Sequence, residues 1–185
     1  MRRTVIKSLL AGVIGMLGAG YVEAGEGPGM VLHFASLKEG IVVVCMGGRL
    51  PSGKRFPGPG GLSRTKDWLT GGKTEGAAPD GRQLPEWVEF EWTEYASDKD
   101  DSVKELGPLP VHVERVVIRE RVPQDVIEEV IRCKLATSPG KLPDKSLWLD
   151  FVWTDSGIKF HWRLESIKAA PEYTLRSGGE VIEGS

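Results

Sequence analysis

Two runs of alternating hydrophobic and polar residues near the end of the chain carry its clearest structural signal. Apolar side chains occupy every second position in Leu147–Trp153 and again in Ile158–Leu164, and Asp155-Ser156-Gly157 separates the runs. This period is that of a β-strand, and a short polar break with glycine is typical of a hairpin turn. A lone hairpin is marginal in water, so the pattern predicts that its apolar face packs against a second layer.

The opposite row of the second run contains Lys159, His161, Arg163 and Glu165. This mixed and mainly basic strip is expected to face either a partner or water. Trp153, Phe160 and Trp162 are candidates for stacking on a ligand, but their strict alternation favours core packing.

The rest of the chain predicts more strands and one helix. Strands are expected at 30–34, 41–46, 87–95 and 111–119, and a weaker one near 172–175. Pro123 stands at the first turn of a helix over about 123–135, whose apolar stripe is Val126, Ile127, Val130, Ile131 and Leu135. We therefore expect an α+β fold, with a mainly antiparallel sheet or partial sandwich covered by one amphipathic helix.

The segment 47–82 is rich in glycine and proline and carries seven basic and three acidic residues. Neither helices nor strands propagate well through such a composition, so a long solvated basic loop is expected, with at most a short strand or turn around Trp68-Leu69. No phosphate-loop spacing occurs in it. An exposed Trp68 among basic residues would be a plausible partner anchor, and Arg55 belongs to the same candidate surface.

The strand at 87–95 alternates Val88, Phe90 and Trp92 with Glu89, Glu91 and Thr93, which predicts an acidic outer face. The acidity continues, since residues 86–105 hold eight acidic and two basic side chains. Paired carboxylates can hydrolyse sugars, but this face is expected to be open rather than cleft-like. It is either a solvated face or a surface for a basic partner, and its candidate contacts are Glu89, Glu91, Glu94, Asp98, Asp100 and Asp101.

The first residues resemble an export signal. Arg2, Arg3 and Lys7 precede a short apolar run, and Val22-Glu23-Ala24 supplies the small residues of a cleavage site after residue 24. A retained membrane anchor is the alternative, although the run is shorter than a spanning helix needs. We expect residues 25–185 to form a single exported, soluble domain in the periplasm, with no stable membrane insertion.

Charge and cysteines narrow the range of partners. The chain has 185 residues and a formal net charge of −2, and without residues 1–24, which hold three basic and one acidic side chain, the charge is −4. Such a domain has no overall attraction to nucleic acid. Cys45 and Cys133 would meet an oxidising compartment, so a disulfide between them stays open beside two buried free thiols.

No established catalytic or metal-binding spacing is found. His33, His112 and His161 lie on three different predicted strands, and neither a G-x-S-x-G elbow nor an H-E-x-x-H motif occurs. His33, in an apolar neighbourhood, is expected to be structural. The sequence therefore predicts no catalytic residue, no metal and no cofactor, and a protein that is not an enzyme.

Three segments together resemble a known family. Leu84–Trp92, Arg119–Ile127 and Leu147–Leu164 are similar to a Leu-Pro strand, a Val/Ile-Pro helix start and a closing hairpin in small exported proteins encoded near type VI secretion effectors. Those proteins are immunity proteins, in particular against periplasmic lipase effectors. Many of them are lipoproteins, whereas this chain has no cysteine near the cleavage point.

The resemblance implies a binder that neutralises a cognate secreted effector by tight protein–protein contact. The alternatives are a periplasmic ligand-binding or envelope accessory domain and an envelope hydrolase with an unrecognised site. A homo-oligomer also stays open.

Overall fold

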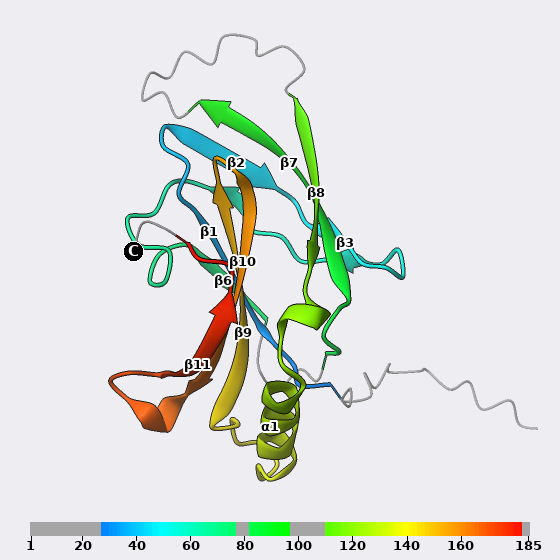
Figure 1. Ribbon diagram of the computed structural model, residues 1–185, viewed down its shortest axis with the longest axis vertical. Coiled ribbons are helices and arrows are strands. Elements are labelled where there is room, and N and C mark those ends of the chain that lie inside the picture. The colour runs from blue at the N-terminus through cyan, green and yellow to red at the C-terminus, as the bar shows by residue number, and fades with distance from the viewer. Residues whose placement is uncertain (1–26, 77–81, 97–109, 183–185) are drawn as a thin grey trace, which may run out of the picture.

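The computed structural model describes residues 27–76, 82–96 and 110–182, and its strands form two β-sheets (Figure 1). Sheet A contains, in order across the sheet, β11 (Thr174–Gly179), β10 (Gly157–Ser166), β9 (Lys145–Thr154), β1 (Val31–Ser36) and β6 (Lys73–Glu75). Sheet B contains β4 (Arg55–Phe56), β3 (Gly48–Arg49), β7 (Trp87–Ala96), β2 (Ile41–Cys45) and β5 (Gly60–Leu62), with β8 (Val111–Val117) paired to β7. The predicted β-rich α+β fold is confirmed.

The predicted hairpin is the centre of sheet A. β9 and β10 pair antiparallel with Phe160 opposite Phe151 and Trp162 opposite Leu149. The eight apolar side chains of the two alternating runs are buried: Leu147, Leu149, Phe151, Trp153, Ile158, Phe160, Trp162 and Leu164. One pairing departs from the antiparallel pattern, because β1 lies parallel to β9.

The two sheets meet in an aromatic core. The ring centroids of Phe151 on sheet A and Phe90 on sheet B are 5.1 Å apart, at an interplanar angle of 68°. Phe34 of β1 stacks on Phe151, and Trp153 contacts Phe90 edge to face. Buried aromatic rings contribute large apolar areas and specific edge-to-face contacts, so they fix how the sheets pack.

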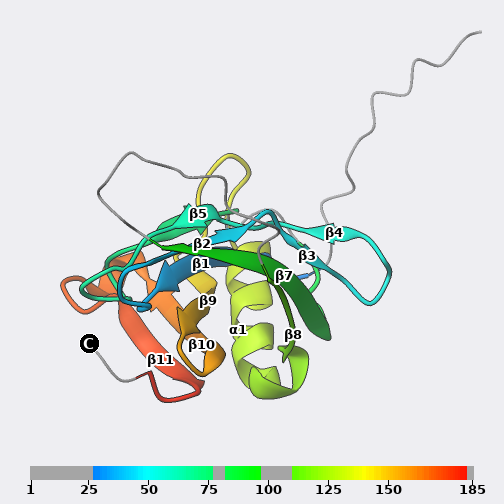
Figure 2. The ribbon, with the colours of Figure 1, turned by 90° about the horizontal axis from the view of Figure 1, so that it is seen from above.

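The single helix among the described residues, α1 (Gln124–Leu135), closes the side of the two layers between β8 and β9 (Figure 2). It follows a 3-10 turn at Arg119–Arg121 and begins directly after Pro123, as the sequence predicts. Val126, Ile127 and Val130 are buried. Leu135 is 78% exposed, because the helix ends there and its last turn extends past the sheet.

The Gly/Pro-rich segment is not a continuous loop. It holds four short strands, β3 to β6, that add to the edges of both sheets. Gly72 brings the segment back onto β1: its φ is +96°, and a Cβ there would stand 2.2 Å from the carbonyl oxygen of Phe34. Only glycine tolerates both that conformation and that approach.

The predicted export signal at 1–24 lies outside the described residues. In the part of the chain that the structure describes, no helix has the length and apolarity to cross a membrane.

Candidate functional site

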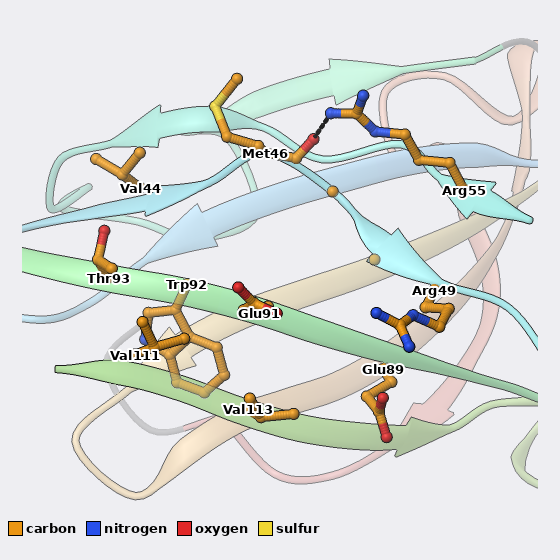
Figure 3. A pocket seen from close by; sticks show the side chains of 12 residues that line it. Val44, Met46, Arg49, Arg55, Glu89, Glu91, Trp92, Thr93, Val111 and Val113 are labelled. Carbon is orange, nitrogen blue, oxygen red and sulfur yellow. Dashed lines mark hydrogen bonds between the residues drawn. The ribbon is translucent and has the colours of Figure 1, made fainter. Parts of the chain in front are cut away.

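A hollow of about 330 Å³ lies on the outer face of sheet B (Figure 3). We call it the sheet B hollow. Its lining comes from five strands (β2, β3, β4, β7 and β8) and the bend after β2: Val44, Met46, Gly47, Gly48, Arg49, Arg55, Glu89, Glu91, Trp92, Thr93, Val111 and Val113. The strand register explains this grouping, because Glu91 lies opposite Val113, and Thr93 lies between Val111 and Val44.

Exposed apolar side chains distinguish this face. Met46 is 66% exposed, Val111 56% and Val113 60%. In Figure 3, Met46 lies on one side of β7 and the two valines lie on the other. Single exposed apolar residues are common, but several gathered over one hollow with a charged rim are typical of an interaction surface.

Glu89 occupies the end of the hollow where charges are already compensated. Its carboxylate accepts a hydrogen bond from Arg115 on β8 at 2.9 Å, and Arg49 lies opposite it on β3. The Arg115 guanidinium also lies 4.0 Å from the ring centroid of Trp87. This cation–π contact holds Arg115 in place, so this end is preorganised rather than free.

Glu91 lies in the middle of the hollow, two residues further along β7. It is exposed and makes no hydrogen bond or ion pair with any residue the structure describes. Arg55, across the hollow, donates a hydrogen bond from Nη2 to the Met46 carbonyl at 2.6 Å. A free carboxylate beside exposed valine and methionine side chains can bind a basic group that is itself flanked by apolar surface.

The structure brings together three of the eight residues predicted to bind a partner: Arg55, Glu89 and Glu91. Glu94 was expected on the same acidic face, but it shares the inner face of β7 with Trp92. There it accepts hydrogen bonds from Lys38 at 2.7 Å and from Trp92 Nε1 at 3.0 Å. These bonds lower the pKa of Glu94 although burial opposes the shift.

The prediction of an exposed Trp68 is wrong. Trp68 is only 5% exposed and packs with Ala35 and Val152 on the face of sheet A that points away from the aromatic core. Asp98, Asp100 and Asp101 lie outside the described residues.

The polar strip of β10 is largely covered rather than open to a partner. Arg163 is buried, and its Nε and Nη2 donate hydrogen bonds to Asp150 of β9, which is completely buried. Burial alone would raise the pKa of Asp150, but hydrogen bonds from His161, His33 and Arg163 hold it well below its usual range. His33 is thus a bonded structural residue, as the sequence predicts.

The two cysteines are free thiols. Cys45 is buried in the core, and the loss of solvation raises its pKa to about 11. No group of three or more His, Cys, Asp or Glu side chains within the described ranges is arranged to hold a metal ion.

A second cavity, of about 400 Å³, opens beside residues 82–86. Its lining is mainly apolar and includes Met30, Leu50, Phe56 and Leu84, with Arg55 and Arg82 among its polar residues. Small-molecule sites are commonly apolar cavities of this size with few polar groups.

Comparison with protein-family models, curated proteins and solved structures finds no match for this chain.

Two features of these sites escaped sequence reasoning. Val111 and Val113 alternate with polar residues in the sequence, but the neighbouring residues do not indicate which face of β8 is covered. Asp150 was visible as a carboxylate inside an apolar run, Leu149-Asp150-Phe151, which is a signal for a buried charge with partners elsewhere in the chain.

Proposed function

We propose that this chain is an exported immunity protein that neutralises a cognate secreted antibacterial effector by binding it through the sheet B hollow. The observation that carries the binding role is the hollow itself, where exposed Met46, Val111 and Val113 surround Glu91, whose carboxylate pairs with no described residue. The resemblance of three segments to effector-associated immunity proteins supports the class of partner.

The composition of the hollow indicates how such a complex would be held. Apolar side chains at the centre of an interface supply most of the affinity when water is excluded, and a charge there selects a partner of opposite sign. The effector surface is then expected to present a lysine or arginine within an apolar patch. A standard interface buries roughly 800 Å² on each partner, so the contact would extend beyond the hollow over β7 and β8.

The test is co-expression of the full chain with the product of an adjacent toxin-like open reading frame. We expect the two to co-purify as a stable 1:1 or 2:2 complex, and we expect the chain to protect cells that export the toxin. Light scattering distinguishes the two stoichiometries and tests the homo-oligomer. Absence of both a complex and protection overturns the immunity proposal.

A matched pair of variants locates the contact. Val113→Asp places a charge in the hollow, whereas Glu172→Lys changes an exposed residue between β10 and β11. Loss of the complex with the first variant and retention with the second is expected. Equal affinities for both variants would place the contact elsewhere.

A ligand-binding domain is the second candidate, and the apolar cavity around Phe56 and Leu84 is the observation that favours it. Native mass spectrometry of protein purified from its own compartment tests this candidate. A bound small molecule that is lost in Leu84→Trp, a variant that fills the cavity, would support it.

A further inference from the structure

Residues 63–72 form a lid over the polar face of sheet A; we call this segment the Trp68 loop. At its start, the backbone N–H of Thr65 donates to the carbonyl of Ser36 at 2.8 Å. In its middle, the Trp68 ring packs on Ala35 and Val152 and makes a T-shaped contact with the His161 ring at a centroid distance of 5.3 Å. Trp68 Nε1 has no hydrogen-bond partner among the described residues, so ring packing rather than a hydrogen bond holds the indole.

His33 links the far end of this loop to the charges beneath it. Its Nδ1 lies 3.0 Å from Asp150 Oδ1, and its Nε2 lies 2.6 Å from the carbonyl oxygen of Gly71. Both neighbours are acceptors, since a carbonyl cannot donate and Asp150 already accepts two hydrogen bonds from Arg163. A doubly protonated imidazole ring donates to both acceptors, whereas a neutral ring donates to only one.

Charged and titratable groups face His33 from β9, from β10 and from the Trp68 loop. Asp150 faces it from β9, while His161, Arg163 and Glu165 come from β10, and Asp67 from the loop interacts with it electrostatically. Arg163 is shared between the carboxylates of Asp150 and Glu165. A doubly protonated His33 ring would place a second positive charge beside these two carboxylates.

We propose that the Trp68 loop is a pH-sensitive lid, which doubly protonated His33 holds closed and which opens when the ring loses a proton. A neutral ring that keeps its proton on Nδ1 leaves the Gly71 carbonyl without a donor. A neutral ring that keeps it on Nε2 turns a lone pair towards the Asp150 carboxylate. Both arrangements weaken the contact between β1 and the loop, so rising pH uncovers His161, Asp150 and Arg163.

The test follows the His33 ring and the loop in the same sample of the full chain. Nitrogen-15 spectra of the histidine rings report the protonation of His33 between pH 5.5 and 8.5. Protection factors for exchange of the Thr65 amide, which normalise the intrinsic effect of pH, report loop closure. We expect protection of Thr65 to fall about tenfold or more as His33 loses its proton, because a hydrogen bond to a charged group is lost. Amides of β9 and β10 should keep their protection.

Two variants test whether His33 causes the pH dependence of Thr65 protection. His33→Gln is expected to make Thr65 protection independent of pH, while His112→Gln, which changes an exposed histidine on β8, should leave the transition unchanged. Three results would overturn the proposal: constant Thr65 protection while the His33 ring titrates, a singly protonated His33 with the loop closed at every pH, or a transition that persists in His33→Gln. If His33→Gln does not fold, the unmodified protein still tests the proposal, because its ring spectra and its Thr65 protection are compared at each pH.

Discussion

Arg163 binds Asp150 through one edge of its guanidinium, with hydrogen bonds from Nε to Oδ2 at 2.9 Å and from Nη2 to Oδ1 at 2.8 Å. The two residues lie on neighbouring strands of the central hairpin, on the face turned away from the aromatic core. Arg163 also lies over the Trp148 ring at 4.8 Å from its centroid. A two-bond pairing of guanidinium and carboxylate is among the strongest polar contacts in proteins, and here it is shielded from water.

Asp150→Asn should strongly destabilise the fold. The amide has no charge to offset Arg163, and leaving one member of a buried ion pair uncompensated costs about 3–5 kcal/mol. Urea unfolding of the variant measures this loss. Asp155→Asn, in the exposed turn of the same hairpin, is the control and should stay within about 0.5 kcal/mol of the unmodified protein. A loss below about 1 kcal/mol for Asp150→Asn would contradict the assigned role.

The stabilisation by Asp150 should also depend on pH with a defined sign. Because the carboxyl pKa is lower in the folded protein than in the unfolded chain, its contribution is complete above the unfolded value of about 3.9. This contribution is lost as the pH falls from the pKa of the unfolded chain towards the lower pKa of the folded protein. The difference in unfolding free energy between the unmodified protein and Asp150→Asn should therefore shrink as the pH falls below about 4. A difference that grows on acidification would refute this assignment.

The two thiols should react at very different rates. Cys45 is buried and its pKa is raised to about 11, so at pH 8 little of it is the reactive thiolate. Cys133 is half-buried on the helix. Native protein treated with iodoacetamide should be modified first at Cys133, with Cys45 reacting only after unfolding, as peptide mass spectrometry can show. Equal labelling of both residues in native protein would contradict the buried position of Cys45.

Gly157→Ala should destabilise the hairpin turn. The backbone φ of Gly157 is +108°, and a Cβ there would stand 2.6 Å from Glu114 Oε2, the oxygen that accepts the Ile158 N–H at 3.0 Å. We expect a loss of about 1–3 kcal/mol from backbone strain and a displaced hydrogen bond. Gly61→Ala is the matched control, because a Cβ at Gly61 meets nothing within 4 Å. Thermal melts of the two variants should separate clearly, and coinciding melts would exclude the close contact.

Glu91→Lys should weaken the proposed complex without harming the fold. The Glu91 side chain is exposed and unpaired among the described residues, so the melting temperature of the variant should stay close to that of the unmodified protein. Charge reversal in the middle of the hollow is expected to reduce affinity for the neighbouring toxin product at least tenfold, measured by calorimetry. Glu89→Lys is the comparison within the hollow; because Glu89 is already paired with Arg115, that reversal should also lower stability. Unchanged affinity for Glu91→Lys would remove Glu91 from the contact.

Local pattern was enough to predict most elements. The period-2 runs correctly placed the apolar faces of β7, β9 and β10, and Pro123 with the apolar stripe placed α1 to within one residue. These features depend on residues close in sequence, whose side-chain directions follow from backbone geometry alone. The short strands β3 to β6 were missed, because each has two or three residues and is stabilised by pairing with strands far away in the sequence.

The candidate sites were less predictable for the same reason. Glu89 and Glu91 were correctly placed on the outer face of β7, whereas Glu94 was not, because it follows the alternation onto the inner face. Trp68 was expected to be exposed in a basic loop, and it is buried because that loop folds back over Ala35 and Val152.

The sequence by itself determined which residues of β9 and β10 share a face, because successive side chains of a strand point to opposite sides. Only the tertiary structure decided what covers each face. His161 and Arg163 have the polarity of a solvated strip, yet the Trp68 loop and the carboxylate of Asp150 enclose them. A polar side chain on a strand needs hydrogen-bonding partners, and either water or a distant segment of the chain can supply them. The sequence pattern alone does not distinguish the two.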